Sequence, residues 1–119
     1  MSTHKDLKVW QKSMDLVEQV YKITVGFPAE EKFGLVNQIR RASVSVPVNI
    51  SEGAARNSPR DYIRFIRISF GSLSELETLL LIGARLGMID IETLRPVLGH
   101  IKLISAQLSG LIRSIEKYA

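Results

Sequence analysis

Apolar residues recur three and four positions apart along most of the chain, which is the spacing of amphipathic helices. Glycine and proline interrupt this pattern at "GFPAEEKFG" (26–34), "NSPRD" (57–61) and "GMID" (87–90). The stretches between them predict four helices, over about residues 5–25, 34–56, 59–86 and 90–118. Amphipathic helices with short connections pack side by side. We therefore expect an all-α fold, an antiparallel up-down-up-down four-helix bundle, with one domain over residues 1–119.

Local signals support the helix ends. Ser58 is a good N-cap, Pro59 suits the first helical position, and Asp61 favours the first turn. Gly87 is typical of a helix C-terminus, and Asp90 is a suitable cap for the last helix.

Each predicted helix has one face that gathers its apolar residues, and we expect this face to build the core. In the first helix it carries Leu7, Trp10, Met14, Val17, Tyr21 and Thr24. In the second it carries Leu35, Ile39, Ala42, Val46, Ile50 and Gly53. In the third it carries Tyr62, Ile66, Ser69, Leu73 and Leu80, flanked by Phe70 and Leu76. In the fourth it carries Leu94, Val97, Ile101, Ile104, Leu108, Leu111, Ile115 and Tyr118.

The second helix has an additional apolar face. Val44, Val48 and Ala55 point nearly opposite to its core residues. A polar flank lies between the two faces and consists of Gln38, Ser45, Asn49, Glu52 and Arg56. The second face is either ordinary surface or a contact with another subunit, and its length of three turns favours the contact. On the core face, we expect Gly53 to permit a close approach between helices.

Pro47 lies in the middle of the second helix, where a proline lacks the N–H of a normal helical residue and clashes with the preceding turn. We therefore expect a kink at Pro47 that bends the helix around its neighbour. The carbonyl of Ser43 loses its helical partner, and the short side chains of Ser43, Ser45 and Asn49 are candidates to satisfy groups at the break.

The formal net charge is +4, and all of it falls within residues 36–71, which hold six arginines and two acids. Arg60, Arg64 and Arg67 are spaced four and three apart, so they form a basic stripe on one side of the third helix. Such a stripe is either a solvated helix face or a contact for an anionic partner. With Arg56, these arginines are our candidate nucleic-acid-binding residues.

Glu77 falls about 40° from the centre of the core face of the third helix. A carboxylate there needs a partner. We expect it to reach the polar flank of the second helix, within the subunit or across an interface, where Asn49 and Arg56 are the candidates.

Three segments of the chain resemble the 23S rRNA intervening-sequence proteins. They are the opening "DLKVWQKSMDLVEQVYKIT" (6–24), "SVSVPVNISEGAAR" (43–56) and "YIRFIRISFGSLSELETLL" (62–80). The most specific part is the Ser-Val-Pro-x-Asn-Ile-x-Glu-Gly core. In this chain it consists of Ser45, Val46, Pro47, Asn49, Ile50, Glu52 and Gly53.

The resemblance implies an antiparallel four-helix bundle from a bacterial family whose genes lie in insertions of 23S rRNA genes. It also implies assembly into a homopentamer. The related accessory variability proteins of diversity-generating retroelements are credited with nucleic-acid binding through a basic surface. No catalytic residue comes with the family. The motif residues carry over as structural or interface positions, to which we add Val44, Val48 and Glu77.

Together these features favour a non-catalytic, oligomeric binding module associated with the ribosome or with nucleic acid, RNA or DNA. An alternative is a structural scaffold that binds a protein partner. A helical nuclease is a remote third possibility, and it rests on the Arg-x4-His spacing of Arg95 and His100. Tyr62 and Phe65 are candidates for base stacking, but their positions lie nearer the core, which favours packing.

Other classes find little support. The chain has no cysteine, which excludes disulfides and thiolate sites. The two histidines do not form Glu-x-x-His pairs, and Glu75 and Glu77 point in different directions, so we expect no metal site. The longest apolar run, "LLLIGA" (79–84), is too short to span a bilayer. We expect a cytoplasmic protein without cofactor, small-molecule substrate or membrane partner.

Overall fold

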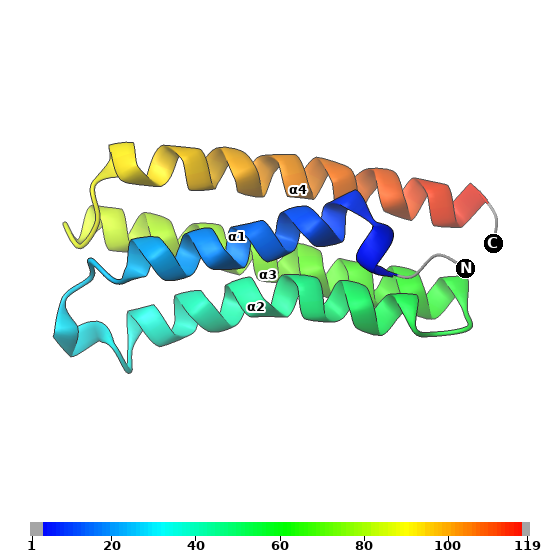
Figure 1. Cartoon of the computed structure of the whole chain (residues 1–119), viewed down its shortest axis with the longest axis horizontal. Coiled ribbons are helices and arrows are strands. Elements are labelled where there is room, and N and C mark those ends of the chain that lie inside the picture. The colour runs from blue at the N-terminus through cyan, green and yellow to red at the C-terminus, as the bar shows by residue number, and fades with distance from the viewer. Residues whose placement is uncertain (1–3, 118–119) are drawn as a thin grey trace.

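The computed structural model describes residues 4–117, and within that range it contains helices and no strand (Figure 1). The four helices are α1 (Lys8–Thr24), α2 (Leu35–Ala54), α3 (Pro59–Arg85) and α4 (Ile91–Lys117). Two short 3₁₀ turns are η1 (His4–Asp6) and η2 (Ala29–Glu31). The predicted all-α class and number of long helices are confirmed.

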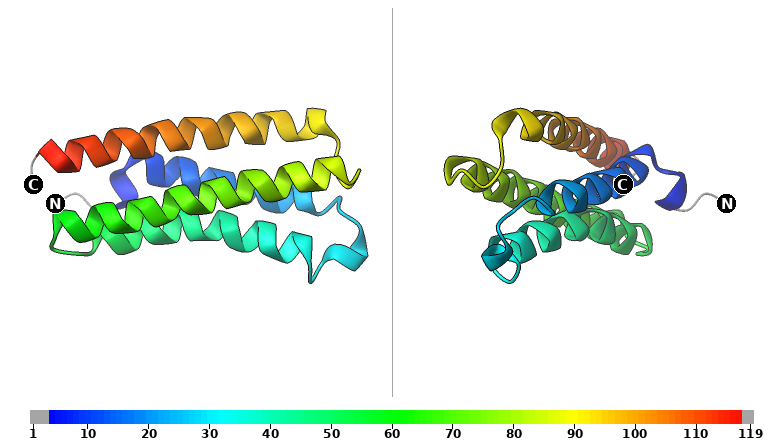
Figure 2. Two further views of the ribbon diagram at one scale, coloured as in Figure 1. Left: turned by 180° about the vertical axis from the view of Figure 1, so that it is seen from behind. Right: turned by 60° about the vertical axis from the view of Figure 1, so that its left-hand side comes forward.

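Each helix lies antiparallel to the next, in an elongated body of 46 × 24 × 21 Å (Figures 1 and 2). Helix α1 packs on α2 and α4, and α3 packs on α2 and α4, whereas in the described part of the chain no Cα atoms of the diagonal pairs lie within 8 Å of each other. This is the up-down-up-down arrangement expected from the short connections. The contact between α2 and α3 is by far the most extensive of the four.

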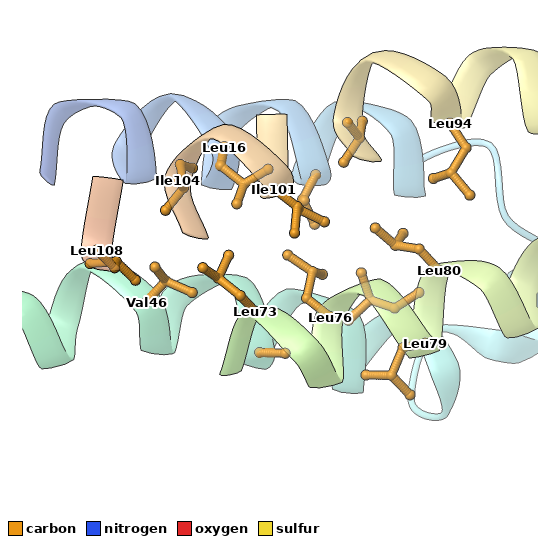
Figure 3. Packing of buried hydrophobic residues seen from close by; sticks show 14 of the residues in the cluster. Leu16, Val46, Leu73, Leu76, Leu79, Leu80, Leu94, Ile101, Ile104 and Leu108 are labelled. Carbon is orange, nitrogen blue, oxygen red and sulfur yellow. The ribbon is translucent and has the colours of Figure 1, made fainter. Parts of the chain in front are cut away.

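The core fills the space between the four helices with aliphatic side chains (Figure 3). Leu16, Ile39, Leu76 and Ile104, one from each helix, are completely buried. The core faces predicted for α2 and α3 are confirmed, with Tyr62 and Phe70 at their margins. On α4 the buried series ends at Ile112, while two residues of the predicted stripe, Leu111 and Ile115, are only partly buried. Tyr118 lies outside the described residues.

The prediction for the first helix was wrong in its start and in most of its core face, although Thr24 is buried as predicted and Leu7 and Trp10 pack against the core. Residues 4–6 form the separate turn η1, so the helix begins at Lys8. Its buried side is Val9, Ser13, Leu16, Val20 and Thr24. The Ser13 hydroxyl donates to the carbonyl of Val9 at 2.7 Å, which allows this polar side chain to lie in the core. The predicted stripe of Trp10, Met14, Val17 and Tyr21 is turned by about 100°, one residue, and is partly or fully exposed.

The predicted helix ends are confirmed at α3. The hydroxyl of Ser58 accepts a hydrogen bond from the backbone N–H of Asp61 at 3.2 Å, and Pro59 occupies the first position. At the other end Gly87 has φ +75°, and the N–H of Met88 donates to the carbonyl of Gly83 at 2.9 Å. This is a Schellman motif, which requires the left-handed conformation that glycine adopts easily.

Small side chains bring α2 and α3 together. A Cβ atom on Gly53 would lie 2.9 Å from Cβ of Phe65 and 3.1 Å from the carbonyl oxygen of Tyr62. The Ser69 hydroxyl donates to the carbonyl of Val46 at 2.9 Å, so a polar bond crosses the buried contact. The hydroxyls of Ser45 and Ser72 share another hydrogen bond, of 2.7 Å. The small polar residues of the central motif therefore serve close packing.

Helix α2 continues through Pro47, which is buried. The nearby polar side chains bond carbonyls other than that of Ser43: the Ser43 hydroxyl donates to Arg40, and the Asn49 amide donates to Ser45. Ser43 and Asn49 therefore bond carbonyls within about one turn of the break, while the Ser43 carbonyl accepts from neither of them. The kink at Pro47 stays a prediction.

We predict that Gly53→Ala lowers the free energy of unfolding by about 1–3 kcal/mol, because the new methyl group meets a rigid Cβ and a backbone carbonyl. Gly71→Ala and Gly99→Ala are matched controls, since a Cβ at either helical position meets nothing within 4 Å. Both control substitutions should raise the free energy of unfolding by about 0.5–1 kcal/mol. Urea denaturation measures all three. A Gly53→Ala protein as stable as the controls would contradict the close approach.

Candidate nucleic-acid interface

Three arginines of α3 line one shallow depression of about 740 Å³. Arg60, Arg64 and Arg67 are exposed, and they follow one another along the first two turns and the start of the third. The rest of the lining is Ser58, Asp61 and Ile63. The helical spacing of these arginines thus places their side chains in one continuous surface, with a single acid among them.

Arg56 joins this surface from the end of α2. Its guanidinium carbon lies 5.0 Å from the centroid of the Phe65 ring, and the guanidinium carbon of Arg64 lies at the same distance. We call Arg56, Arg60, Arg64 and Arg67 the arginine surface. The two cations at Phe65 leave this aromatic ring covered by charge, so its outer side is polar.

Two members of the arginine surface have acidic neighbours. Arg56 lies 3.5 Å from Glu52, and Arg64 lies 4.0 Å from Asp61. The side chains of both pairs are between 48% and 67% exposed, and exposed ion pairs of this kind contribute little stability. A phosphate group can therefore compete with these carboxylates for the guanidinium groups.

A second depression, of about 480 Å³, lies where α3 meets the C-terminal part of α4. Arg67 lines it from α3 and Arg113 lines it from α4, with Phe70, Ser109 and Ile112 between them. The sequence analysis missed Arg113, because it is far from Arg67 in the sequence and only the packing of α3 on α4 makes them neighbours. The one available signal was its place outside the predicted core stripe of the last helix.

Tyr62 and Phe65 pack between α2 and α3, which supports the packing interpretation over base stacking. Both side chains meet the position where Gly53 lacks a Cβ. Tyr62 is half-buried, and this burial raises the pKa of its hydroxyl above the usual value because the charged phenolate is poorly solvated there.

The motif residues of α2 and the added interface candidates Val44 and Val48 divide into two groups. Ser45, Asn49 and Gly53 face α3 or bond within α2, so in this chain they serve internal packing. Val44 and Val48 point to the other side, where Val44 is 36% and Val48 is 47% exposed. The motif therefore builds both the contact with α3 and an outer face.

That outer face is one wall of an apolar groove of about 300 Å³ between α1 and α2. Its lining is His4, Trp10, Met14, Val17, Val44, Pro47, Val48 and Ser51. The stripe of α1 that was predicted to lie in the core thus forms the opposite wall. We call this feature the α1–α2 groove.

Our prediction for Glu77 within the chain was wrong. Glu77 is exposed and lines a depression on the α4 side of α3, together with Lys102 and Ser105. Its predicted partners bond elsewhere, since Asn49 donates to Ser45 and Arg56 pairs with Glu52. The helical wheel placed Glu77 near the core and toward α2, whereas the side chain is exposed and lies toward α4.

The residues of the nuclease hypothesis make separate contacts. Arg95 is exposed and pairs with Glu92 at 2.9 Å. His100 shares a hydrogen bond of 3.0 Å with Gln19 of α1. The two side chains therefore do not converge on a common site.

Two further searches covered the described part of the chain. Residues 4–117 contain no cluster of three or more histidine, aspartate and glutamate side chains that could hold a metal ion. Over the same residues, none of the helices has the length and hydropathy needed to span a bilayer.

One family model and one solved structure relate this chain to known proteins. Residues 5–110 match the family model described as 23S rRNA-intervening sequence protein. A solved structure with a TM-score of 0.78 is a protein with unknown function from the S23 ribosomal protein family of Bacteroides thetaiotaomicron. It is 25% identical, and the similarity covers 87% of this chain and 97% of that chain. The comparison with curated proteins found no match.

We predict that Tyr62 makes stability fall at alkaline pH. Because its pKa is raised in the folded state, the contribution is fully present below about pH 10, the pKa of an unfolded tyrosine, and is lost as the pH rises through the folded value. Urea midpoints between about pH 8 and 11 should therefore decline less for Tyr62→Phe than for the wild type. Parallel curves for the two proteins would contradict the burial of this hydroxyl.

Proposed function

We propose, since this chain belongs to the 23S rRNA-intervening sequence protein family, that it is a non-catalytic module that binds the phosphate backbone of nucleic acid through its arginine surface. The observation that carries this proposal is the depression on α3 into which Arg60, Arg64 and Arg67 all project. RNA is the first candidate partner, because the family takes its name from 23S rRNA.

The chemistry of the arginine surface suits phosphate. A guanidinium group forms two parallel hydrogen bonds to a phosphate and keeps its charge at any physiological pH. From Arg60 to Arg67 the helix rises about 10 Å, which corresponds to about three phosphates along one strand of a duplex. With no base-reading motif in the sequence, such binding recognises backbone and shape.

Self-association is the second part of the proposal. The α1–α2 groove exposes Met14, Val44 and Val48 side by side, and a second copy of the chain would remove them from water. The family resemblance leads us to expect a homopentamer. Several copies in one ring would repeat the arginine surface, so that avidity compensates for the modest charge of one chain.

A scaffold that binds a protein partner is the alternative function. The α1–α2 groove favours it, because an amphipathic helix of another protein would fit between two helices of this chain. In that case the arginine surface would be a solvated face.

We predict that the wild-type protein binds RNA with a strong salt dependence and that Arg60→Ala/Arg64→Ala/Arg67→Ala weakens binding at least tenfold, because each lost phosphate contact lowers both affinity and salt slope. Fluorescence anisotropy at two salt concentrations measures this. The matched control is Lys8→Ala/Lys12→Ala/Lys22→Ala, which removes three exposed positive charges from α1. Equal losses of RNA affinity in both triple variants would show that binding depends on net charge alone. A wild-type protein that does not bind RNA would contradict the proposal.

We also predict that Val48→Asp dissociates the oligomer, because a carboxylate in the α1–α2 groove would be desolvated by the second copy. Light scattering gives the mass of the particle. Leu103→Asp on α4 is the control, since Leu103 is 44% exposed and does not line the groove. An unchanged mass for Val48→Asp would exclude the groove as the interface.

A further inference from the structure

The second depression, which we call the α3–α4 cleft, is lined by Arg67 and Arg113. Its chemistry differs from that of the arginine surface. The two helices run side by side in this region, as seen from behind the molecule (Figure 2). Arg67 and Arg113 are exposed, Phe70 and Ser109 are partly buried, and Ile112 is 7% exposed. The cleft thus combines two cations at its rim with an aromatic ring and an aliphatic side chain deeper inside.

Neither arginine of the cleft has an acidic partner. Among the described side chains no carboxylate lies within 4.0 Å of the guanidinium of Arg67 or of Arg113, whereas Arg56, Arg64 and Arg95 all have one. Gly110 adds no side chain beside Arg113, whose Nη2 lies 3.8 Å from the position that a Cβ would occupy. The two charges are therefore unneutralised and face the same space.

The aromatic ring in the cleft is also free of cations, unlike the other ring near the arginine surface. Phe65 has the guanidinium groups of Arg56 and Arg64 over it, each at 5.0 Å. No cation is placed over Phe70 in the described part of the chain, although Phe70 lines the cleft. Phe70 packs partly buried against the core and also lines the cleft, with no cation over its ring in the described part of the chain.

We propose that this cleft binds one unpaired nucleotide of a nucleic-acid strand, with its phosphate between Arg67 and Arg113 and its base against Phe70 and Ile112. A volume of about 480 Å³ is in the range of pockets that hold small organic ligands. The Ser109 hydroxyl lies in the lining, where it can donate to a phosphate or sugar oxygen. This assignment rests on the proposed function and adds a preference to it.

The preference is for single strands over duplexes. In a duplex the bases are paired and stacked inside, so a duplex offers only phosphates to the cleft. A flexible strand can turn one base outward, and the contact of that base with an aromatic side chain adds affinity whatever its sequence. The arginine surface would hold the strand on one side of this position, where Arg64 and Arg60 follow from Arg67, the residue that belongs to both features.

The test is fluorescence anisotropy with two probes, a single-stranded oligouridine and a duplex RNA of equal length. Phe70→Leu and Arg113→Ala are compared with the wild type, after circular dichroism and thermal melting have shown that each is folded. Phe33→Leu is the matched control, because Phe33 is 87% exposed in the α1–α2 connection, away from the cleft. Leucine keeps the partly buried position apolar, and Arg113 is exposed, so both test variants preserve the core.

The expected result is that Phe70→Leu weakens binding of the single strand about tenfold and leaves the duplex unchanged, while Phe33→Leu affects neither. Arg113→Ala should weaken the single strand as well. Both probes could bind through the arginine surface while Phe70→Leu changes neither affinity, or changes both affinities equally. That result would show that the nucleotide site is wrong, and the proposed function would stand. If the wild type binds neither probe, both fail.

Discussion

Helices α2 and α3 can lie close together because glycine and serine residues occur at several of their points of contact. Gly53 leaves room for Phe65 and Tyr62, and hydrogen bonds from Ser69 and between Ser45 and Ser72 satisfy polar groups that the contact buries. A larger residue at Gly53 would push the helices apart at this end of their contact, since packed interiors yield little. This contact explains why residues 43–53 of α2 include several small polar side chains although one face of the helix lies in the core.

The functional surfaces depend on that contact. Because α3 is held against α2 by its small residues, its arginines point outward, and Arg56 from the end of α2 joins them at Phe65. On the other side of α2, Val44 and Val48 face α1 and form the α1–α2 groove. One helix thus separates a polar surface suited to phosphate from an apolar surface suited to another copy of the chain. The α3–α4 cleft adds a third surface, which is lined by two arginines and by the aromatic ring of Phe70.

Helical periodicity was enough to predict the number of helices, their connections, the cap at Ser58 and the role of Gly53, because each depends on local sequence. Periodicity failed where two orientations of a helix about its own axis fit the sequence equally well. Helix α1 has two adjacent apolar faces, and only the packing on α2 and α4 decides that Leu16 is buried and Met14 exposed. The same ambiguity placed Glu77 beside the wrong helix, and Arg113 becomes a neighbour of Arg67 only after the bundle has formed.

Native-state amide hydrogen exchange tests the central role of the α2–α3 contact most directly, because it measures the free energy of opening residue by residue. If this contact is the framework of the bundle, amides within residues 39–53 of α2 and 62–76 of α3 should exchange only through global unfolding. Amides of α1, which is the shortest helix and meets its neighbours less extensively, should exchange through a lower-energy opening. Slower exchange in α1 than in α2 and α3 would contradict this account.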